Sequence, residues 1–133
     1  MTDEKLLRFA RGFALAAGLA DFSTGLGLLA LPQFTLGAMG VAAPGAEAMT
    51  FLQFVGVFVG SVGASYLLAL ASGRRDRLWA VFRITTLFRF GAGTFIAVMV
   101  ATGRLEWKWL SVTVTDGIIA GVQLWLLARE PRA

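Results

Sequence analysis

The chain has 133 residues, of which 57% are hydrophobic and 15% are charged, and it contains neither cysteine nor histidine. That absence excludes disulfide bonds, thiolate chemistry, the usual zinc and iron–sulfur sites and histidine-ligated haem, and it removes the commonest general base. The net charge of +4 does not indicate nucleic-acid binding, because the basic residues cluster at the ends of apolar segments, as membrane topology signals do.

Four apolar segments nearly fill the chain. They cover about residues 8–31, 50–72, 78–102 and 107–128. At a rise of about 1.5 Å per residue, each is long enough to cross a hydrocarbon core of roughly 30 Å. We therefore expect a single domain, residues 1–133, that is an all-α integral membrane bundle of four transmembrane helices.

The first segment ends at Pro32, a residue poorly suited to continuing a helix. Its start carries basic residues, as a signal peptide would: Lys5, Arg8 and Arg11. The apolar run is nevertheless too long for a signal peptide, and Asp21 interrupts it. We expect an uncleaved first helix, followed by a loop over residues 32–49 that lies partly in the membrane interface.

The basic residues predict the orientation of the bundle. Eight lie on one side of the predicted membrane: Lys5, Arg8, Arg11, Arg74, Arg75, Arg77, Arg129 and Arg132. Arg104 and Lys108 lie on the other side. Because cytoplasmic loops are enriched in lysine and arginine, both termini are expected in the cytoplasm. Trp107 and Trp109 then fit an aromatic belt at the outer surface, and Trp79 fits one at the inner surface.

Three ionisable residues, Asp21, Arg89 and Asp116, lie inside three different segments. Counted from the cytoplasmic ends, each lies roughly 16–20 Å deep, close to the midplane. A charge at that depth costs several kcal/mol unless it is paired or hydrated, so we expect the three to form one polar core. Arg83 lies about 9 Å nearer the cytoplasm, from where its long side chain can reach the interface.

Small and polar residues recur every three or four positions on each segment. Thr86 shares a stripe with Arg89, and Gln123 shares one with Asp116. The second segment carries a stripe made of Gln53, Gly56, Gly60 and Gly63. Such stripes face the interior of a membrane bundle. The candidate binding or buried polar-core residues are Asp21, Arg89, Asp116, Arg83, Gln123 and Thr86.

Two interpretations of this core stay open. It is either a salt-bridge network that only fixes the helix order, or a functional centre that holds a ligand head group or passes a proton or ion. The sequence shows no nucleotide-binding loop, metal-ligand cluster or nucleophile–base pair, so we expect neither catalytic residues nor a metal site.

The aromatic residues allow a second kind of site, an aromatic-lined pocket for a quinone, carotenoid or lipid, to which Tyr66 can supply a hydroxyl. The phenylalanines that either face lipid or line such a pocket are Phe51, Phe54, Phe58, Phe82, Phe88, Phe90 and Phe95.

Four stretches carry a family resemblance: GLADFSTGLGLLALP in the first segment, LGAMGV in the first loop, GVFVGSVGASYLLAL in the second segment and QLWLLARE in the last. In the spacing of its helical segments and the placement of its glycines, most of the chain resembles small bacterial four-pass membrane proteins of the DoxX-like kind. The resemblance implies a four-helix membrane bundle, and some members look like subunits of quinone-linked oxidoreductases. No catalytic residue of that family matches a position in this chain.

The sequence therefore favours a small non-enzymatic protein of the bacterial inner membrane. It is expected to act as a subunit of a homo-oligomer or larger membrane complex, or to bind a hydrophobic or amphipathic molecule around its Asp–Arg–Asp core. The alternatives are a proton-coupled or ion transporter that uses Asp21 or Asp116, and a membrane subunit of a quinone-linked oxidoreductase. The expected partners are the lipid bilayer and other membrane proteins, and no nucleic acid.

Overall fold

The computed structural model describes residues 1–130, and these residues form helices and no strand. Arg132, one of the basic residues used to predict the orientation, lies outside the described residues. The elements in chain order are α1 (Asp3–Ala30), α2 (Pro32–Ala38), α3 (Ala46–Ala71), α4 (Arg75–Ala101), the 3-10 turn η1 (Trp107–Trp109) and α5 (Leu110–Leu127).

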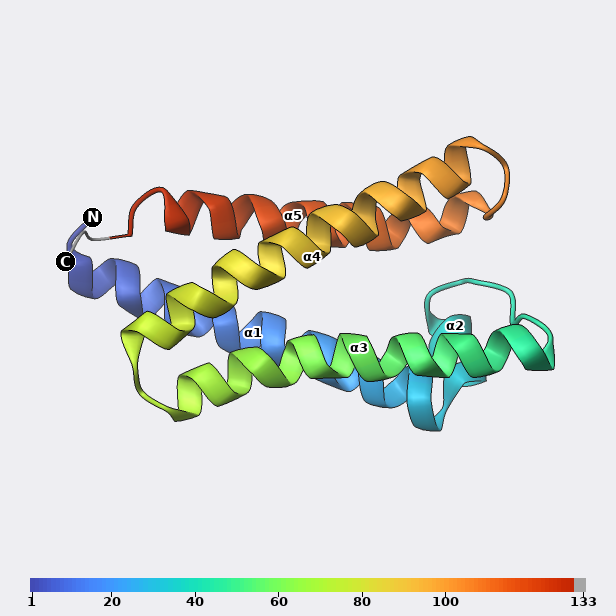
Figure 1. Ribbon diagram of the computed structural model, residues 1–133, viewed down its shortest axis with the longest axis horizontal. Coiled ribbons are helices and arrows are strands. Elements are labelled where there is room, and N and C mark those ends of the chain that lie inside the picture. Colours follow the sequence, from blue (N-terminus) through green and yellow to red (C-terminus); the bar gives the residue numbers. More distant parts are fainter. Residues whose placement is uncertain (131–133) are drawn as a thin grey trace.

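The four long helices form two antiparallel pairs (Figure 1). α1 packs along α3, and α4 packs along α5. The start of α1, the turn between α3 and α4 and the end of α5 lie together at one end of the molecule. By length and composition, four helical segments of the described chain could cross a membrane: α1, α3, α4 and η1 continued by α5.

Three of these helices begin before the predicted apolar segments do. α1 starts at Asp3 and not near residue 8, and α3 and α4 start at Ala46 and Arg75. Acidic residues in the first turn, Asp3 in α1 and Asp76 in α4, interact favourably with the positive end of the helix dipole. Polar residues that flank an apolar segment can therefore extend its helix, so hydropathy alone places the helix start too late.

The first loop contains a helix that the sequence did not predict. After a break at Leu31, Pro32 occupies the first turn of α2, where its missing N–H costs nothing. Leu36 of α2 is fully buried and clusters with Leu28 and Val41. The loop also bonds to the segment before η1, since the Ala42 backbone N–H donates to Glu106 Oε1 at 3.0 Å.

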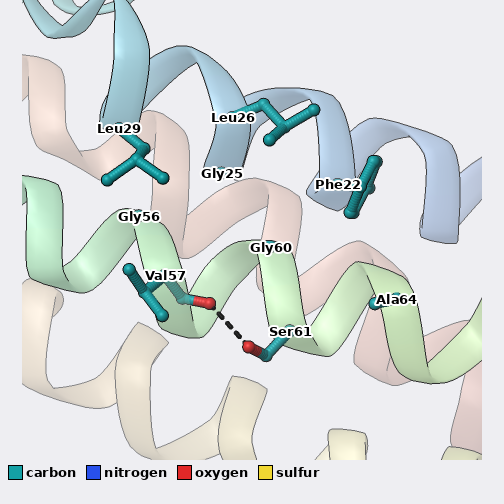
Figure 2. A pocket seen from close by; sticks show the side chains of 9 residues that line it. All are labelled: Phe22, Gly25, Leu26, Leu29, Gly56, Val57, Gly60, Ser61 and Ala64. Atoms are coloured by element: carbon teal, nitrogen blue, oxygen red, sulfur yellow. Dashed lines mark hydrogen bonds between the residues drawn. The ribbon is translucent and has the colours of Figure 1, made fainter.

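Glycines bring α1 and α3 into direct backbone contact. A Cβ built on Gly25 would lie only 2.3 Å from the backbone nitrogen of Gly60, and one built on Gly63 would lie 2.3 Å from that of Phe22. Figure 2 shows the two helices side by side at this seam, with Gly25 facing Gly56 and Gly60. The small-residue stripe predicted on the second segment therefore packs inside the chain.

A hydrophobic cluster joins the two pairs at the end that holds the start of α1. It includes Leu6 of α1, Tyr66 of α3, Phe82 of α4 and Leu126 of α5. Trp79 belongs to it: it is 1% exposed and packs edge-on against Phe82, with ring centroids 5.6 Å apart. The prediction that Trp79 lies in an interfacial aromatic belt is thus wrong, because its helix turns this residue toward the other three helices.

The predicted phenylalanine group divides into two kinds. Phe82 is completely buried in the cluster just described. The others are between 51% and 66% exposed and lie on the outward faces of α3 and α4: Phe51, Phe54, Phe58, Phe88, Phe90 and Phe95. An outer surface this rich in large apolar side chains matches the composition of a lipid-facing surface and not of a water-facing one.

Candidate functional site

An ion triad joins three helices at the centre of the bundle. Arg89 of α4 donates from Nη1 to Oδ1 of Asp116 on α5 at 2.6 Å, and from Nη2 to Oδ2 of Asp21 on α1. The arginine side chain is 5% exposed, and the two aspartates are 16% and 15% exposed. The structure therefore brings together the three residues that the sequence placed at one depth, and it links both helix pairs through them.

Close approach of α4 and α5 places Asp116 beside Arg89. Gly93 lies one turn after Arg89, and a Cβ built there would be 3.8 Å from the Asp116 Cβ. Thr113, one turn before Asp116, donates its hydroxyl to the Gly93 carbonyl at 3.1 Å. A small residue on one helix and an interhelical hydrogen bond thus set the separation at which the guanidinium can pair with the carboxylate.

A second polar layer lies beside the triad and involves α3, α4 and α5. Gln123 donates from Nε2 to the Tyr66 hydroxyl at 2.6 Å and to Thr85 Oγ1 at 2.7 Å. Tyr66 in turn donates to Thr85 at 2.8 Å, and the Thr86 hydroxyl lies 3.2 Å from Gln123 Oε1. Because Tyr66 and Gln123 are completely buried, these bonds satisfy groups that no water reaches.

Tyr66 connects the two layers. Its hydroxyl lies 3.5 Å from Nη2 of Arg89, and the guanidinium carbon lies 6.0 Å from the centre of its ring. The polar network therefore runs through all four long helices. The sequence predicts Gln123 and Thr86 as members of this core and Tyr66 only as part of an aromatic pocket, and it does not identify Thr85. Thr85 lies four residues before Arg89, and this spacing, which puts both on one face of a helix, is the signal that indicates it.

Arg83 lies outside this network. Its guanidinium pairs with Glu130, just beyond the end of α5, and the side chain is 56% exposed. The structure thus supports the expectation that Arg83 extends away from Arg89, and it removes Arg83 from the candidate core. Six residues separate the two arginines along α4, which corresponds to about 9 Å at the rise of a helix.

The triad is not balanced in charge. Two carboxylates face one guanidinium, so the three groups carry a net charge of −1 when all are ionised. Within residues 1–130, the other ion pairs are Arg74–Asp76 and Arg83–Glu130, and neither contributes a cation to the triad. The Nε of Arg89 is also buried without a hydrogen-bond partner in this part of the chain. The core therefore has an excess carboxylate charge and one unused donor.

Residues 1–130 contain no group of three or more histidine, cysteine, aspartate or glutamate side chains arranged to hold a metal ion. Comparison with protein-family models, with curated proteins and with solved structures gave no match. The polar core and the surfaces around it are therefore the features that indicate a function.

Proposed function

We propose that the protein is a non-enzymatic multi-pass protein of a bacterial inner membrane that binds a hydrophobic or amphipathic molecule at the Asp21–Arg89–Asp116 core. It does so as a homo-oligomer or as a subunit of a larger membrane complex. The observation that carries the proposal is the incomplete pairing of the triad. Each unpaired group is costly away from water, so a molecule or ion that completes the pairing would stabilise the core.

The arrangement of the helix ends supports four membrane crossings with both termini in the cytoplasm. The start of α1, the α3–α4 turn and the end of α5 lie at the same end of the molecule (Figure 1). The described basic residues counted for the cytoplasmic side belong to these three places: Lys5, Arg8, Arg11, Arg74, Arg75, Arg77 and Arg129. This distribution follows the positive-inside rule.

A comparison of two variants tests the binding function. The triple variant Asp21→Asn, Arg89→Ala, Asp116→Asn removes all three charges, so it leaves no uncompensated ion in the core. The control, Arg83→Gln, removes a charge from the same helix outside the core. Each protein is purified in a mild detergent, and its bound small molecules are extracted and identified by mass spectrometry.

We expect wild type and the Arg83→Gln control to retain the same bound molecule and the triple variant to lose it while remaining folded. An identical set of bound molecules in all three proteins, or none in wild type, would show that the core is only structural. Mass spectrometry of the intact complexes identifies partner chains in the same samples, and a stable monomer without partners would contradict the proposed assembly.

The excess carboxylate favours a second candidate function, a proton-coupled or ion transporter. In that case Asp21 or Asp116 takes up the proton or cation that balances the triad. Wild type in liposomes would then move protons, as reported by an enclosed pH-sensitive dye, and Asp116→Asn would abolish the flux. Absence of flux from wild type at a range of applied gradients would eliminate this candidate and leave the binding function.

A further inference from the structure

A groove of about 440 Å³ runs between α4 and α5 and has Arg89 in its lining. Along α4 it extends from Arg89 to Ala101, twelve residues, which is about 18 Å at the rise of a helix. Half of a hydrocarbon core measures about 15 Å, so the groove has the length of one membrane leaflet. Apart from Arg89 and two threonines its lining is apolar, with Gly93 and Gly117 leaving space between the helices.

Arg89, which lines the α4–α5 groove, carries the unpaired donor of the polar core. Both Nη atoms of Arg89 already bond to the aspartates, whereas Nε is buried and has no partner within the described chain. A buried N–H without an acceptor is destabilising, so a molecule that brings an acceptor to Arg89 gains a hydrogen bond that the protein alone lacks.

A second groove, between α1 and α3, offers no such donor. It has a volume of about 210 Å³, and Ser61 is its one hydroxyl-bearing side chain. Figure 2 shows that Ser61 turns back along α3, where its hydroxyl donates to the Val57 carbonyl at 2.8 Å. The α1–α3 groove therefore lacks a free donor for a polar head group, and the α4–α5 groove is distinct in this respect.

The charge of the triad defines what the α4–α5 groove accepts. A carboxylate or phosphate head group would meet two aspartates that, when both are ionised, carry a net charge of −1 together with Arg89. A cationic head group has no hydrogen-bond acceptor, so it cannot accept a hydrogen bond from Nε. The complementary group is an uncharged oxygen acceptor attached to a long apolar chain.

We propose that the α4–α5 groove binds a long-chain molecule with a neutral carbonyl head group, whose oxygen accepts a hydrogen bond from Nε of Arg89. The chain of the ligand then lies along α4 toward Ala101. This inference rests on the proposed binding function and specifies its ligand class and its site.

Binding is measured on the purified full chain with three radiolabelled probes of equal chain length: a methyl ketone, the corresponding fatty acid in its ionised form, and the alkane. The carbonyl can accept from Nε, the carboxylate is repelled by the triad, and the alkane has no acceptor. We expect the ketone to bind at least about tenfold more tightly than either of the others. If the fatty acid or the alkane bound as tightly as the ketone, the proposal that Arg89 binds a neutral oxygen acceptor would be wrong.

Substitutions at a matched pair of glycines test whether the ligand binds in the α4–α5 groove. Gly117 and Gly121 lie one turn apart on α5, and at both positions an added Cβ meets nothing within 4 Å, so the two are matched in the space around the backbone. Of the two, Gly117 lines the groove. Gly117→Leu should weaken ketone binding about tenfold or more, whereas Gly121→Leu should leave it unchanged. Ala97→Phe fills the groove from the opposite wall and should repeat the loss.

Equal ketone binding by wild type, Gly117→Leu and Ala97→Phe would show that the groove is not the site. This result is distinguishable from failure of the proposed function. A molecule that co-purifies with these groove variants but is lost from the charge-free triple variant would place binding at the core and outside the groove. A wild-type protein that retains no molecule and binds no ketone would contradict both.

Discussion

At the scale of single residues, Arg89 determines how the centre of the bundle is held together. Its planar guanidinium presents several donors in fixed directions, which lets it pair with Asp21 and Asp116 on two different helices at once. A lysine ammonium is a compact charge on a flexible stem and lacks this fixed fork. The side chain at position 89 therefore fixes the relation of α4 to both α1 and α5.

Removing the Arg89 guanidinium should be more harmful than removing every charge of the triad. Arg89→Ala leaves two buried carboxylates without a cation, and loss of one member of a buried pair costs about 3–5 kcal/mol. Adding Asp21→Asn and Asp116→Asn removes those carboxylate charges, so the triple variant should recover most of the lost stability. Thermal unfolding in detergent measures the stability of the Arg89→Ala protein and of the triple variant. An Arg89→Ala protein as stable as wild type would mean that the triad does not hold the helices together.

The second polar layer gives a separate test at Tyr66. Tyr66→Phe keeps the ring in the hydrophobic cluster but removes the hydroxyl that accepts from Gln123 and donates to Thr85. We expect a loss of about 1–2 kcal/mol, because buried donors lose a partner. Ser61→Ala, which removes an exposed hydroxyl bonded within α3, serves as the control and should be close to neutral. Equal effects of the two substitutions would contradict a stabilising role for this layer.

The sequence predicts part of this site because depth can be counted along a helix. Asp21, Arg89 and Asp116 lie at one depth, and a membrane leaves such charges few alternatives to pairing. The same reasoning does not find the partner of Arg83, because Glu130 follows the last apolar segment and reaches Arg83 only through the packing of α4 on α5. The sequence also does not place Trp79 correctly, because an aromatic residue near a helix end is compatible both with the membrane interface and with the buried core.

At the scale of the helices, the sequence predicts the long helical segments and misses features that depend on contacts between them. A period of three to four and a length of more than twenty residues predict the apolar helices. α2 is short, and its buried Leu36 is explained by packing against Leu28 and Val41, which only the folded chain reveals. The glycine stripe shows that α3 has a close neighbour, but it does not say whether that neighbour is α1 or another copy of the chain.

Alanine substitution at the α1–α3 seam should separate these two helices. A Cβ on Gly25 would overlap backbone atoms of Gly60, which cannot move as a side chain can. We expect Gly25→Ala to lower the stability by about 1–3 kcal/mol or more. Gly12→Ala is the matched control on the same helix, because a Cβ there meets nothing within 4 Å, and it should be neutral or slightly stabilising. Similar losses at both positions would indicate that α1 does not pack on α3 through Gly25.

At the scale of the whole molecule, the two helix pairs meet along their length. The cluster around Phe82 joins them at the end that holds the start of α1, and the ion triad joins them at the centre. At the opposite end, the bond from the Ala42 backbone to Glu106 joins the first loop to the segment before η1. The groove with Arg89 in its lining lies within the α4–α5 pair, so a ligand can occupy it without separating the two pairs.

The orientation in the membrane gives the last prediction. If the chain crosses the membrane four times with both termini in the cytoplasm, as proposed, a reporter active only outside the cytoplasm should give a signal when fused after Pro44 or after Arg104, and none when fused after Arg75. The first two sites lie in the α2–α3 and α4–η1 connections, and the third lies at the start of α4, at the end that also holds the start of α1.

A complementary reporter that is active in the cytoplasm controls for expression. A cytoplasmic signal at Pro44 in a chain whose N-terminus is also cytoplasmic would contradict the four-crossing topology, because α1 could not then span the membrane. With α1 outside the hydrophobic core, the Asp21–Arg89 pair could not lie at its midplane.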